Sequence, residues 1–537
     1  MASYSIIIKN GYVIDGKNSP RVRADVGIKG NIIADIGDLS QETADVEIDA
    51  RDRYVAPGFI DLTSHSDTHW TLFDAPGQES FLWQGVTTIL GGNCGTSLAP
   101  LVSGNEIDAL QKWFDVSSVN INWQSTAEFL DEIEKRPLGV NFATLTGFGT
   151  LRRGSVKNID QGASTGEIDK MRFLLEEALS AGSFGLSTSL GRVHEQSAGT
   201  EELVSLAEVV KKSDGILKYH LRDEGSDILP SLSEVFSITR ASDVRTHISH
   251  FKLIGKGAWK MFNDAMIMIE QGLQNNMHIT LDIYPYTKTG SSLYLLLPSW
   301  AREGGREEIL GNLEDPEKRA LISSALKELT LHYDQMIIAS SFRDQSVVGK
   351  TIEELSVSTN LSSEDVIINL LNVNELTVTI FNEALHEAHI DMFAKKYYSV
   401  FATDGVGYNV AFSKPNDLPH PRSFGTFPKV LNYFVKEKEA LTWEEAIYKM
   451  TKLPADILGL ERRGVIKKNT FADIVVFDPE KIRDKSTYTN PLQYSEGMEW
   501  VLVNGGIAIS EGAISNELHG KILRKEKNNR EWPVSTI

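Results

Sequence analysis

The sequence predicts an α/β protein built on a (β/α)8 barrel, with a small β-sandwich domain and an inserted subdomain. Three observations predict this architecture. Strand-like and helix-like segments alternate through the middle of the chain, both ends are rich in short β segments, and more than 100 residues separate the last two predicted strands of the middle part. The length agrees with several domains, because 537 residues exceed what one compact core holds.

The two ends of the chain have the pattern of one small β domain. Apolar residues within 4–56 alternate or come in short runs, which Asn-Gly, Asp-Gly and Gly-Asn turn pairs interrupt. The part from about residue 462 onward has the same pattern, with ADIVVFDP and WVLVNGGIAI as predicted strands. We therefore expect residues 1–57 and 462–537 to build one β-sandwich domain.

Residues 58–461 have the alternation that a barrel requires. The stretch 167–182, for example, places its apolar residues on one face at helical spacing. Alternating strands and helices imply parallel strands, and eight repeats imply a closed barrel. The predicted strands span residues 58–65, 86–94, 140–148, 184–190, 216–223, 245–252, 279–286 and 398–405.

Residues 287–396 break this alternation. Helical SEDVIINLLN and strand-like LTVTIFN lie here, between the seventh and eighth predicted strands. We expect an inserted subdomain of the kind that covers the mouth of a barrel.

The composition disfavours several classes of partner. The chain has 54 basic and 73 acidic residues, and the difference gives a net charge of −19. A net negative charge repels nucleic acid and anionic membranes. No segment approaches the roughly 20 apolar residues of a membrane span, and the first residues lack the pattern of a signal peptide. The single cysteine, Cys94, forbids an internal disulfide and fits a reducing compartment. We expect a cytoplasmic protein that binds neither nucleic acid nor membranes; a homo-oligomer stays open.

Polar side chains with metal-binding chemistry follow the predicted strands, at the end where barrel enzymes place their active sites. They are His65, Cys94, His220, His250, Tyr284, Tyr286 and Asp404. Taken singly, a cysteine is more often a buried small hydrophobe, and a strand-end histidine is more often a core residue. Their joint occurrence on successive strands favours a zinc site, because thiolate, imidazole and carboxylate are the ligands that zinc takes. The glycine clusters GGNCG and FGTLRRG match no phosphate-binding motif, which excludes nucleotide binding.

Around these residues the chain resembles the amidohydrolase superfamily, and within it the D-aminoacylases (N-acyl-D-amino-acid deacylases). The likeness runs nearly from end to end, through APGFID, QGVTTILGGNCGTSLAPL, HLRDEG, ISHFK, DIYPY and HPRSFGTFPKVL. The GNCG segment is the most specific, because most members of the superfamily have a carboxylated lysine in that functional position.

The resemblance implies a set of metal ligands. Cys94, His220 and His250 match the tight zinc site of the deacylases, and His65 matches the second histidine of the family's His-x-His pair. The first histidine of that pair is replaced by Thr63. We therefore expect one tightly held Zn²⁺ and no complete second site.

The resemblance also implies the groups that act on the substrate. Asp404 matches the aspartate that serves as general base and then as general acid. Residues that match the family's substrate-carboxylate site are Lys252, Tyr284, Ser291 and Arg422.

The function implied is zinc-dependent hydrolysis of the amide bond of N-acyl amino acids, of D configuration by the resemblance. Two alternatives stay open. The chain can be a cyclic amidase or a deaminase of the same superfamily, or a non-catalytic barrel that lost part of its metal site at Thr63.

Overall fold

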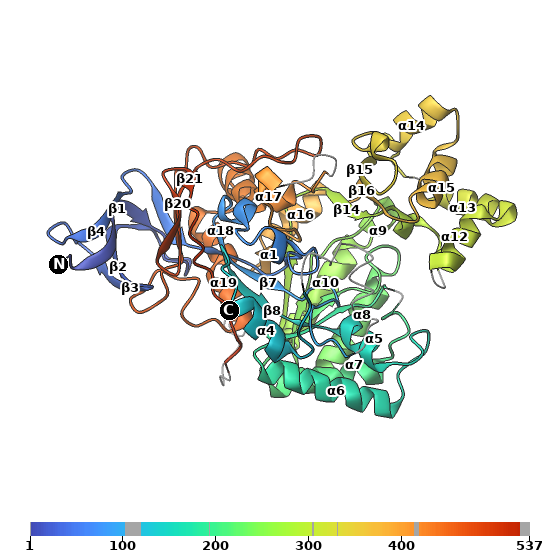
Figure 1. Cartoon of the computed structure of the whole chain (residues 1–537), viewed down its shortest axis with the longest axis horizontal. Coiled ribbons are helices and arrows are strands. Elements are labelled where there is room, and N and C mark those ends of the chain that lie inside the picture. Colours follow the sequence, from blue (N-terminus) through green and yellow to red (C-terminus); the bar gives the residue numbers. More distant parts are fainter. Residues whose placement is uncertain are drawn as a thin grey trace.

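The computed structural model describes residues 2–102, 120–192, 194–302, 306–329, 331–412 and 418–526. A sheet made from both chain ends lies at one end of the molecule, and helices α12 to α15 lie at the opposite end (Figure 1). Parallel strands with flanking helices lie between them. The α/β class that the sequence predicts is confirmed.

Both ends of the chain contribute to one nine-stranded sheet, whose order is β21-β20-β19-β18-β5-β1-β2-β3 with β4 beside β1. The two ends meet where β5 (Tyr54–Pro57) pairs antiparallel with β18 (Ile474–Phe477). Apolar side chains from both ends share one buried cluster, and this burial holds them together. The other strands are β1 (Tyr4–Val13), β2 (Val22–Lys29), β3 (Ile32–Gly37), β4 (Ala44–Asp49), β19 (Met498–Val503), β20 (Gly506–Ser510) and β21 (Ala513–Ile514). Residues 527–537 of the predicted C-terminal part lie outside the described residues.

The middle of the chain contains two parallel sheets that together hold all eight predicted strands. One sheet has the order β6-β7-β8 and the other the order β17-β13-β12-β11-β10-β9. A parallel bridge between Ser64 and Gly405 joins the chain just after β6 to the chain just after β17. The third predicted strand is split into β8 and β9. The bounds are β6 (Phe59–Asp61), β7 (Val86–Gly91), β8 (Asn141–Thr144), β9 (Thr146–Gly147), β10 (Gly185–Ser189), β11 (Ile216–His220), β12 (Arg245–Ile248), β13 (Ile279–Ile283) and β17 (Ser399–Phe401).

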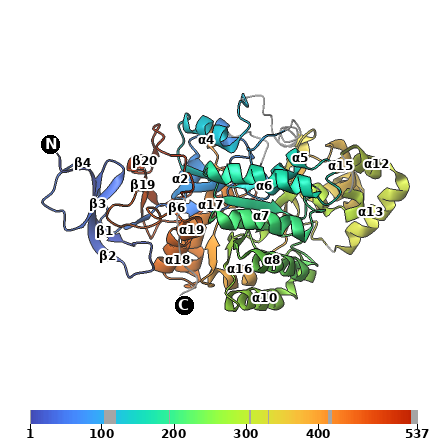
Figure 2. The ribbon, with the colours of Figure 1, turned by 90° about the horizontal axis from the view of Figure 1, so that it is seen from below.

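Amphipathic helices cover the parallel strands. In α6 (Thr165–Ser180), Ser164 and Glu167 form a capping box, and the apolar face expected from the sequence is buried. Helices α6, α7, α8 and α10 pack in succession along one side of the molecule (Figure 2). The other helices here are α1 (Thr71–Asp74), α2 (Glu79–Leu82), α4 (Thr126–Glu134), α5 (Phe148–Ser155), α7 (Thr200–Lys212), α8 (Ile228–Ser242), α9 (Lys256–Trp259), α10 (Phe262–Gln274), α16 (Glu387–Ala394), α17 (Arg422–Lys429) with the π-helical turn Val430–Glu437, α18 (Trp443–Met450) and α19 (Lys452–Leu458). None of the described helices has both the length and the apolar character that a membrane crossing requires.

The segment between β13 and β17 has an apolar core of its own. Its strands form an antiparallel sheet in the order β14-β16-β15. Helix α16 falls inside the predicted range 287–396 but packs instead on the main core, where Phe393 meets Phe251 edge to face. The elements are β14 (Lys288–Ser292), β15 (Ile337–Ser341), β16 (Val378–Glu383), α11 (Ser299–Arg302), α12 (Arg306–Glu314), α13 (Pro316–Glu328), α14 (Ile352–Thr359) and α15 (Ser363–Val373).

Candidate metal centre and active site

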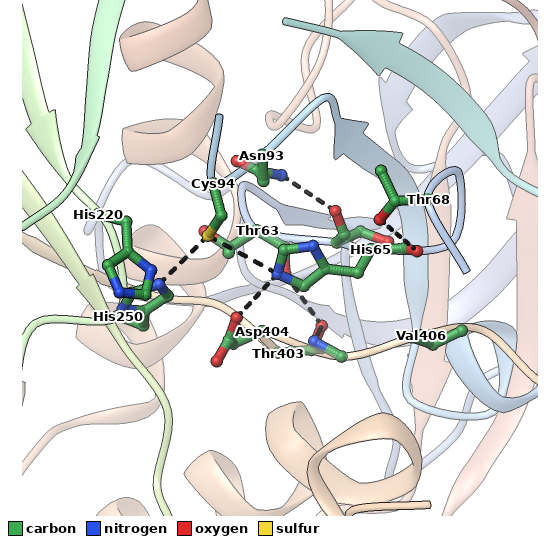
Figure 3. Close-up of polar contacts among 12 residues, drawn as sticks. Thr63, His65, Thr68, Asn93, Cys94, His220, His250, Thr403, Asp404 and Val406 are labelled. Carbon is green, nitrogen blue, oxygen red and sulfur yellow. Dashed lines mark hydrogen bonds and ion pairs between the residues drawn. The ribbon is translucent and has the colours of Figure 1, made fainter. Parts of the chain in front are cut away.

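Cys94, His220 and His250 meet at the C-terminal ends of β7, β11 and β12 (Figure 3). One potential ligand atom from each lies within 4.8 Å of the other two. Cys94 Sγ lies 3.4 Å from Nε2 of His250, and the rings of the two histidines are 4.5 Å apart at their centroids. The backbone at Cys94 and His250 has φ of 50° and 36°. Such left-handed conformations are costly for residues with a side chain and are typical of functional sites.

The donor set fits a zinc ion. Tetrahedral zinc with Zn–S of about 2.3 Å and Zn–N of about 2.0 Å places a sulfur and a nitrogen ligand roughly 3.5 Å apart, which agrees with the 3.4 Å between Cys94 and His250. In addition, Nδ1 of His220 is buried and has no hydrogen-bond partner among the residues that the structure describes. One thiolate and two imidazoles are ligands that zinc prefers. Within the described ranges, this is the one group of three such side chains gathered so closely.

The electrostatics of the cluster match its chemistry. Burial opposes ionisation of the Cys94 thiol, but His250, His220 and His65 outweigh burial and hold the pKa of that thiol well below its usual range. Burial also acts to lower the pKa of His250, but the negative charges around this histidine raise its pKa to about 10. The metal-free cluster is therefore a thiolate beside an imidazolium, and a bound metal would take the place of the imidazolium proton.

Glu224 supports the two histidines and was not found from the sequence. Its carboxylate lies 3.1 Å from Nδ1 of His250 and 3.9 Å from Nε2 of His220. Lys252 donates to the same carboxylate at 2.7 Å and is itself buried. A carboxylate behind a metal-binding histidine fixes the orientation and the tautomer of the ring. The position of Glu224 in HLRDEG, four residues after His220, was the available clue.

Asp404 follows β17 and lies next to the cluster. Its Oδ1 lies 3.0 Å from Nε2 of His65, and its Oδ2 lies 2.8 Å from Nη1 of Arg422. His65 in turn lies 4.0 Å from Cys94 Sγ. The predicted metal ligands and the predicted base thus form one continuous set of contacts (Figure 3).

Arg422 and Tyr284 offer hydrogen-bond donors beside this set. Arg422 begins α17, and its guanidinium carbon lies 5.0 Å from the centre of the Tyr284 ring. Nε of Arg422 and the hydroxyl of Tyr284 are buried, and among the described residues neither has a partner at hydrogen-bonding geometry, although the two side chains lie close enough to interact. Two buried donors next to the cluster of Cys94, His220 and His250 suit an anionic group such as a substrate carboxylate.

The other two residues predicted to bind the substrate lie differently. Lys252 donates to Glu224 at 2.7 Å and to the carbonyl of His250 at 3.1 Å, and it lies 2.8 Å from Nδ1 of His250. Ser291 lies in β14 of the inserted segment, opposite Ile380 of β16. No hydrogen bond joins Ser291 to another site residue among those that the structure describes. Its neighbour Gly290 packs against His420, and Nε2 of His420 donates a hydrogen bond to the carbonyl of Lys288 at 3.0 Å, so β14 lies beside the loop that holds Arg422.

Thr63, at the position of the missing histidine, faces inward. Its hydroxyl donates to Asp282 at 2.5 Å and accepts a hydrogen bond from Lys218. Both charged partners are fully buried. Neither was identified from the sequence: Lys218 lies inside a buried strand, and Asp282 was noted only as part of the DIYPY segment.

Comparison with known proteins agrees with this site. The model of the amidohydrolase family matches residues 300–507. The chain is 33% identical to the N-acyl-D-glutamate deacylase of Alcaligenes xylosoxydans xylosoxydans over 97% of this chain and 96% of the relative. It is 30% identical to the D-aminoacylase of the same organism over 97% and 98%. The chain belongs to the D-aminoacylase family of amidohydrolases.

Solved structures of this family superpose over 97% of the chain. An N-acyl-D-glutamate deacylase from Bordetella bronchiseptica, complexed with zinc and a phosphonate that mimics the tetrahedral intermediate, is 27% identical with a TM-score of 0.83, covering 97% of this chain and 99% of that one. A D-aminoacylase described by one-metal activation and second-metal attenuation of its binuclear centre is 29% identical with a TM-score of 0.81, covering 97% and 100%. A divalent-metal site in this D-aminoacylase-family chain therefore agrees with structures of its relatives.

Proposed function

We propose that this chain hydrolyses the amide bond of N-acyl-D-amino acids with a single zinc ion held by Cys94, His220 and His250. The observation that supports this most is the close approach of those three side chains beside Asp404 and Arg422. The substrates named for two of its relatives, N-acyl-D-glutamate and N-acyl-D-aspartate, have the same linear amide.

We propose that the parallel strands that hold this site form a (β/α)8 barrel. The bridge between Ser64 and Gly405 closes the gap between β6 and β17, and the hydrogen bond from His65 N to the carbonyl of Gly405 at 2.8 Å reinforces it. Closure brings His65 and Asp404, which are far apart in sequence, to neighbouring positions. The limits of the domains, the cytoplasmic location and a homo-oligomer stay predictions.

Zinc in such a site polarises a carbonyl group and lowers the pKa of water. Asp404 is the group that moves the proton. Burial acts to raise the pKa of its carboxyl group, but Arg422, His250 and His65 outweigh burial and hold that pKa well below its usual range. Asp404 is therefore ionised at neutral pH, can accept a proton from the attacking water, and can pass the proton to the leaving amine.

Arg422 and Tyr284 bind the free carboxylate of the substrate in this proposal. Arg422 already neutralises Asp404 through Nη1, and its buried Nε can form a charge-assisted hydrogen bond. The hydroxyl of Tyr284 is the second donor. Lys252 can bind the substrate carboxylate only if it gives up its hydrogen bond to Glu224. Ser291 would bind the substrate carboxylate from β14. Both roles stay predictions.

A substrate panel tests the proposal. Zinc-loaded protein is incubated with N-acetyl-D-amino acids, their L enantiomers and cyclic amides such as hydantoins, and the products are followed by chromatography. We expect the D enantiomers to be hydrolysed to acetate and the free amino acid. Turnover of cyclic amides alone would move the assignment to the cyclic amidases, and no turnover of any substrate by zinc-loaded protein would favour a non-catalytic barrel.

A further inference from the structure

Lys218 is a buried lysine at the centre of the parallel strands, in β11 two residues before His220. Its side chain is fully shielded from solvent. The amino group donates to the carbonyl of Leu62, to the hydroxyl of Thr63 and to Oδ1 of Asn93, the last at 2.9 Å. An ammonium has three hydrogens and no acceptor, so these three oxygens satisfy it fully as a cation.

Asp282 is the counter-charge of this lysine. The Lys218 ammonium lies 3.4 Å from Asp282 Oδ2, which also lies 2.8 Å from Nε2 of His247 and accepts from Thr63. A buried ammonium is costly unless it is paired and hydrogen-bonded. The contacts of Lys218 meet both conditions, so its positive charge is a fixed part of the structure.

The position of this charge bears on metal binding. Thr63 stands where the resemblance places the first histidine of the His-x-His pair, and the ammonium of Lys218 contacts that threonine directly. A hydroxyl engaged by Lys218 and Asp282 is a poor substitute for an imidazole ligand. A second divalent cation bound beside Thr63 would also compete with the Lys218 ammonium for the oxygens of Leu62, Thr63 and Asn93.

The remaining side chains do not assemble a second site. His65 lies 3.0 Å from Asp404 and 4.0 Å from Cys94, but the other oxygen of Asp404 is held by Arg422. Within the described ranges, His65 and Asp404 are not part of any close group of three potential ligands. A second metal therefore lacks a full ligand set, and the Lys218 ammonium already engages the oxygens beside Thr63.

We propose that Lys218 and Thr63 together replace the second metal of the binuclear relatives by a fixed ammonium, which restricts this chain to one zinc and keeps it active in excess zinc. This inference rests on the proposed function, because it presumes the single zinc at Cys94, His220 and His250. In the D-aminoacylase described by second-metal attenuation, the second metal lowers activity. The ammonium of Lys218 would make such attenuation impossible here.

The test is the number of zinc ions bound at saturation. Wild-type protein and the variants Lys218→Ala, Thr63→His and Lys218→Ala/Thr63→His are equilibrated with a large excess of zinc, freed of unbound metal, and measured by elemental analysis and circular dichroism. Only the double variant removes the charge and also supplies the missing ligand. We expect one zinc per chain in the wild type and in both single variants, and two in the double variant, whose activity then falls in excess zinc.

Lys449→Met is the matched control. Lys449 is also a buried lysine that donates to backbone carbonyl groups, those of Lys396 and Ser399. It lies in α18 and contacts the start of β17, whereas Asp404 follows the other end of that strand. The loss of Lys449 removes a buried lysine without touching Cys94, His220 or His250, so this variant should bind one zinc like the wild type.

Each outcome decides the inference. Uptake of two zinc ions by the wild type, or attenuation of its activity by excess zinc, would overturn it even if the double variant failed to fold. A folded double variant that still holds one zinc would also overturn it. A wild type that binds no zinc would instead refute the proposed function, so the two failures are distinguishable.

Discussion

The guanidinium of Arg422 contacts the carboxylate of Asp404, with Nη1 2.8 Å from Oδ2. The other carboxylate oxygen lies 3.0 Å from His65. The predicted base is therefore held at both oxygens, and the predicted substrate-binding arginine is one of its two partners. Loss of Arg422 should consequently affect substrate binding first and the ionisation of Asp404 second.

Asp404→Asn should leave the zinc content intact and lower kcat by a factor of about 100 to 10,000, because an amide cannot accept the proton of water. Asp478→Asn is the matched control, since Asp478 is a buried aspartate that pairs with an arginine, Arg53, in the terminal sheet. The control should keep wild-type turnover. Near-normal rates for Asp404→Asn would show that another group moves the proton, with His65 the next candidate.

Arg422→Met should raise KM for N-acyl amino acids by roughly 10- to 100-fold, the effect expected when a charge-assisted hydrogen bond of about 1.5–3 kcal/mol is lost. Amides without the carboxylate, which we expect to be poor substrates of the wild type, should change little. Lys429→Met is the control, because Lys429 lies in the same helix and covers the ring of Tyr286 as Arg422 covers that of Tyr284. Equal losses on both kinds of substrate would mean that Arg422 has only a structural role.

Cys94→Ala should remove the tightly held zinc and with it the activity, because a thiolate ligand is lost from a site of three protein ligands. Ser97→Ala alters the same loop without a proposed ligand, since Ser97 donates to the carbonyl of Ala99. Elemental analysis after dialysis should find one zinc per chain in the control and none in Cys94→Ala. Full metal content and activity in the cysteine variant would make Cys94 an ordinary core residue.

Zinc binding should release protons and tighten as pH rises. Burial acts to lower the pKa of His250, but nearby negative charges raise it to about 10, so this ligand is protonated in metal-free protein at neutral pH. The folded, metal-free form loses that proton only as pH rises through about 10. Below this value, zinc affinity should increase about tenfold per pH unit for each proton displaced. Calorimetry in buffers of different ionisation enthalpy measures the release, and an affinity independent of pH between 6 and 8 would contradict it.

The candidate metal ligands could be predicted from the sequence because each of these polar side chains follows an apolar run that is typical of a buried strand. The structure has strands at the predicted positions before Cys94, His220 and His250. These strands could be predicted because the alternation of strands and helices depends on local patterns of apolar residues. Local sequence patterns do not specify which side chains from different strands come into contact. Glu224 behind the histidines and Lys218 beside Thr63 depend on which strands become neighbours. The pairing of Arg422 with Asp404 joins a helix start to a strand end, and no spacing rule foretells it.

The most direct test of the account is a zinc titration of chelator-treated protein during hydrolysis of an N-acetyl-D-amino acid. The account predicts no activity without metal, a linear rise as zinc is added, and a plateau at about one equivalent per chain, because Cys94, His220 and His250 form one site. Release of the free D-amino acid is followed by chromatography. Hydrolysis at the same rate without zinc, or activity that appears only with a second equivalent, would contradict the account.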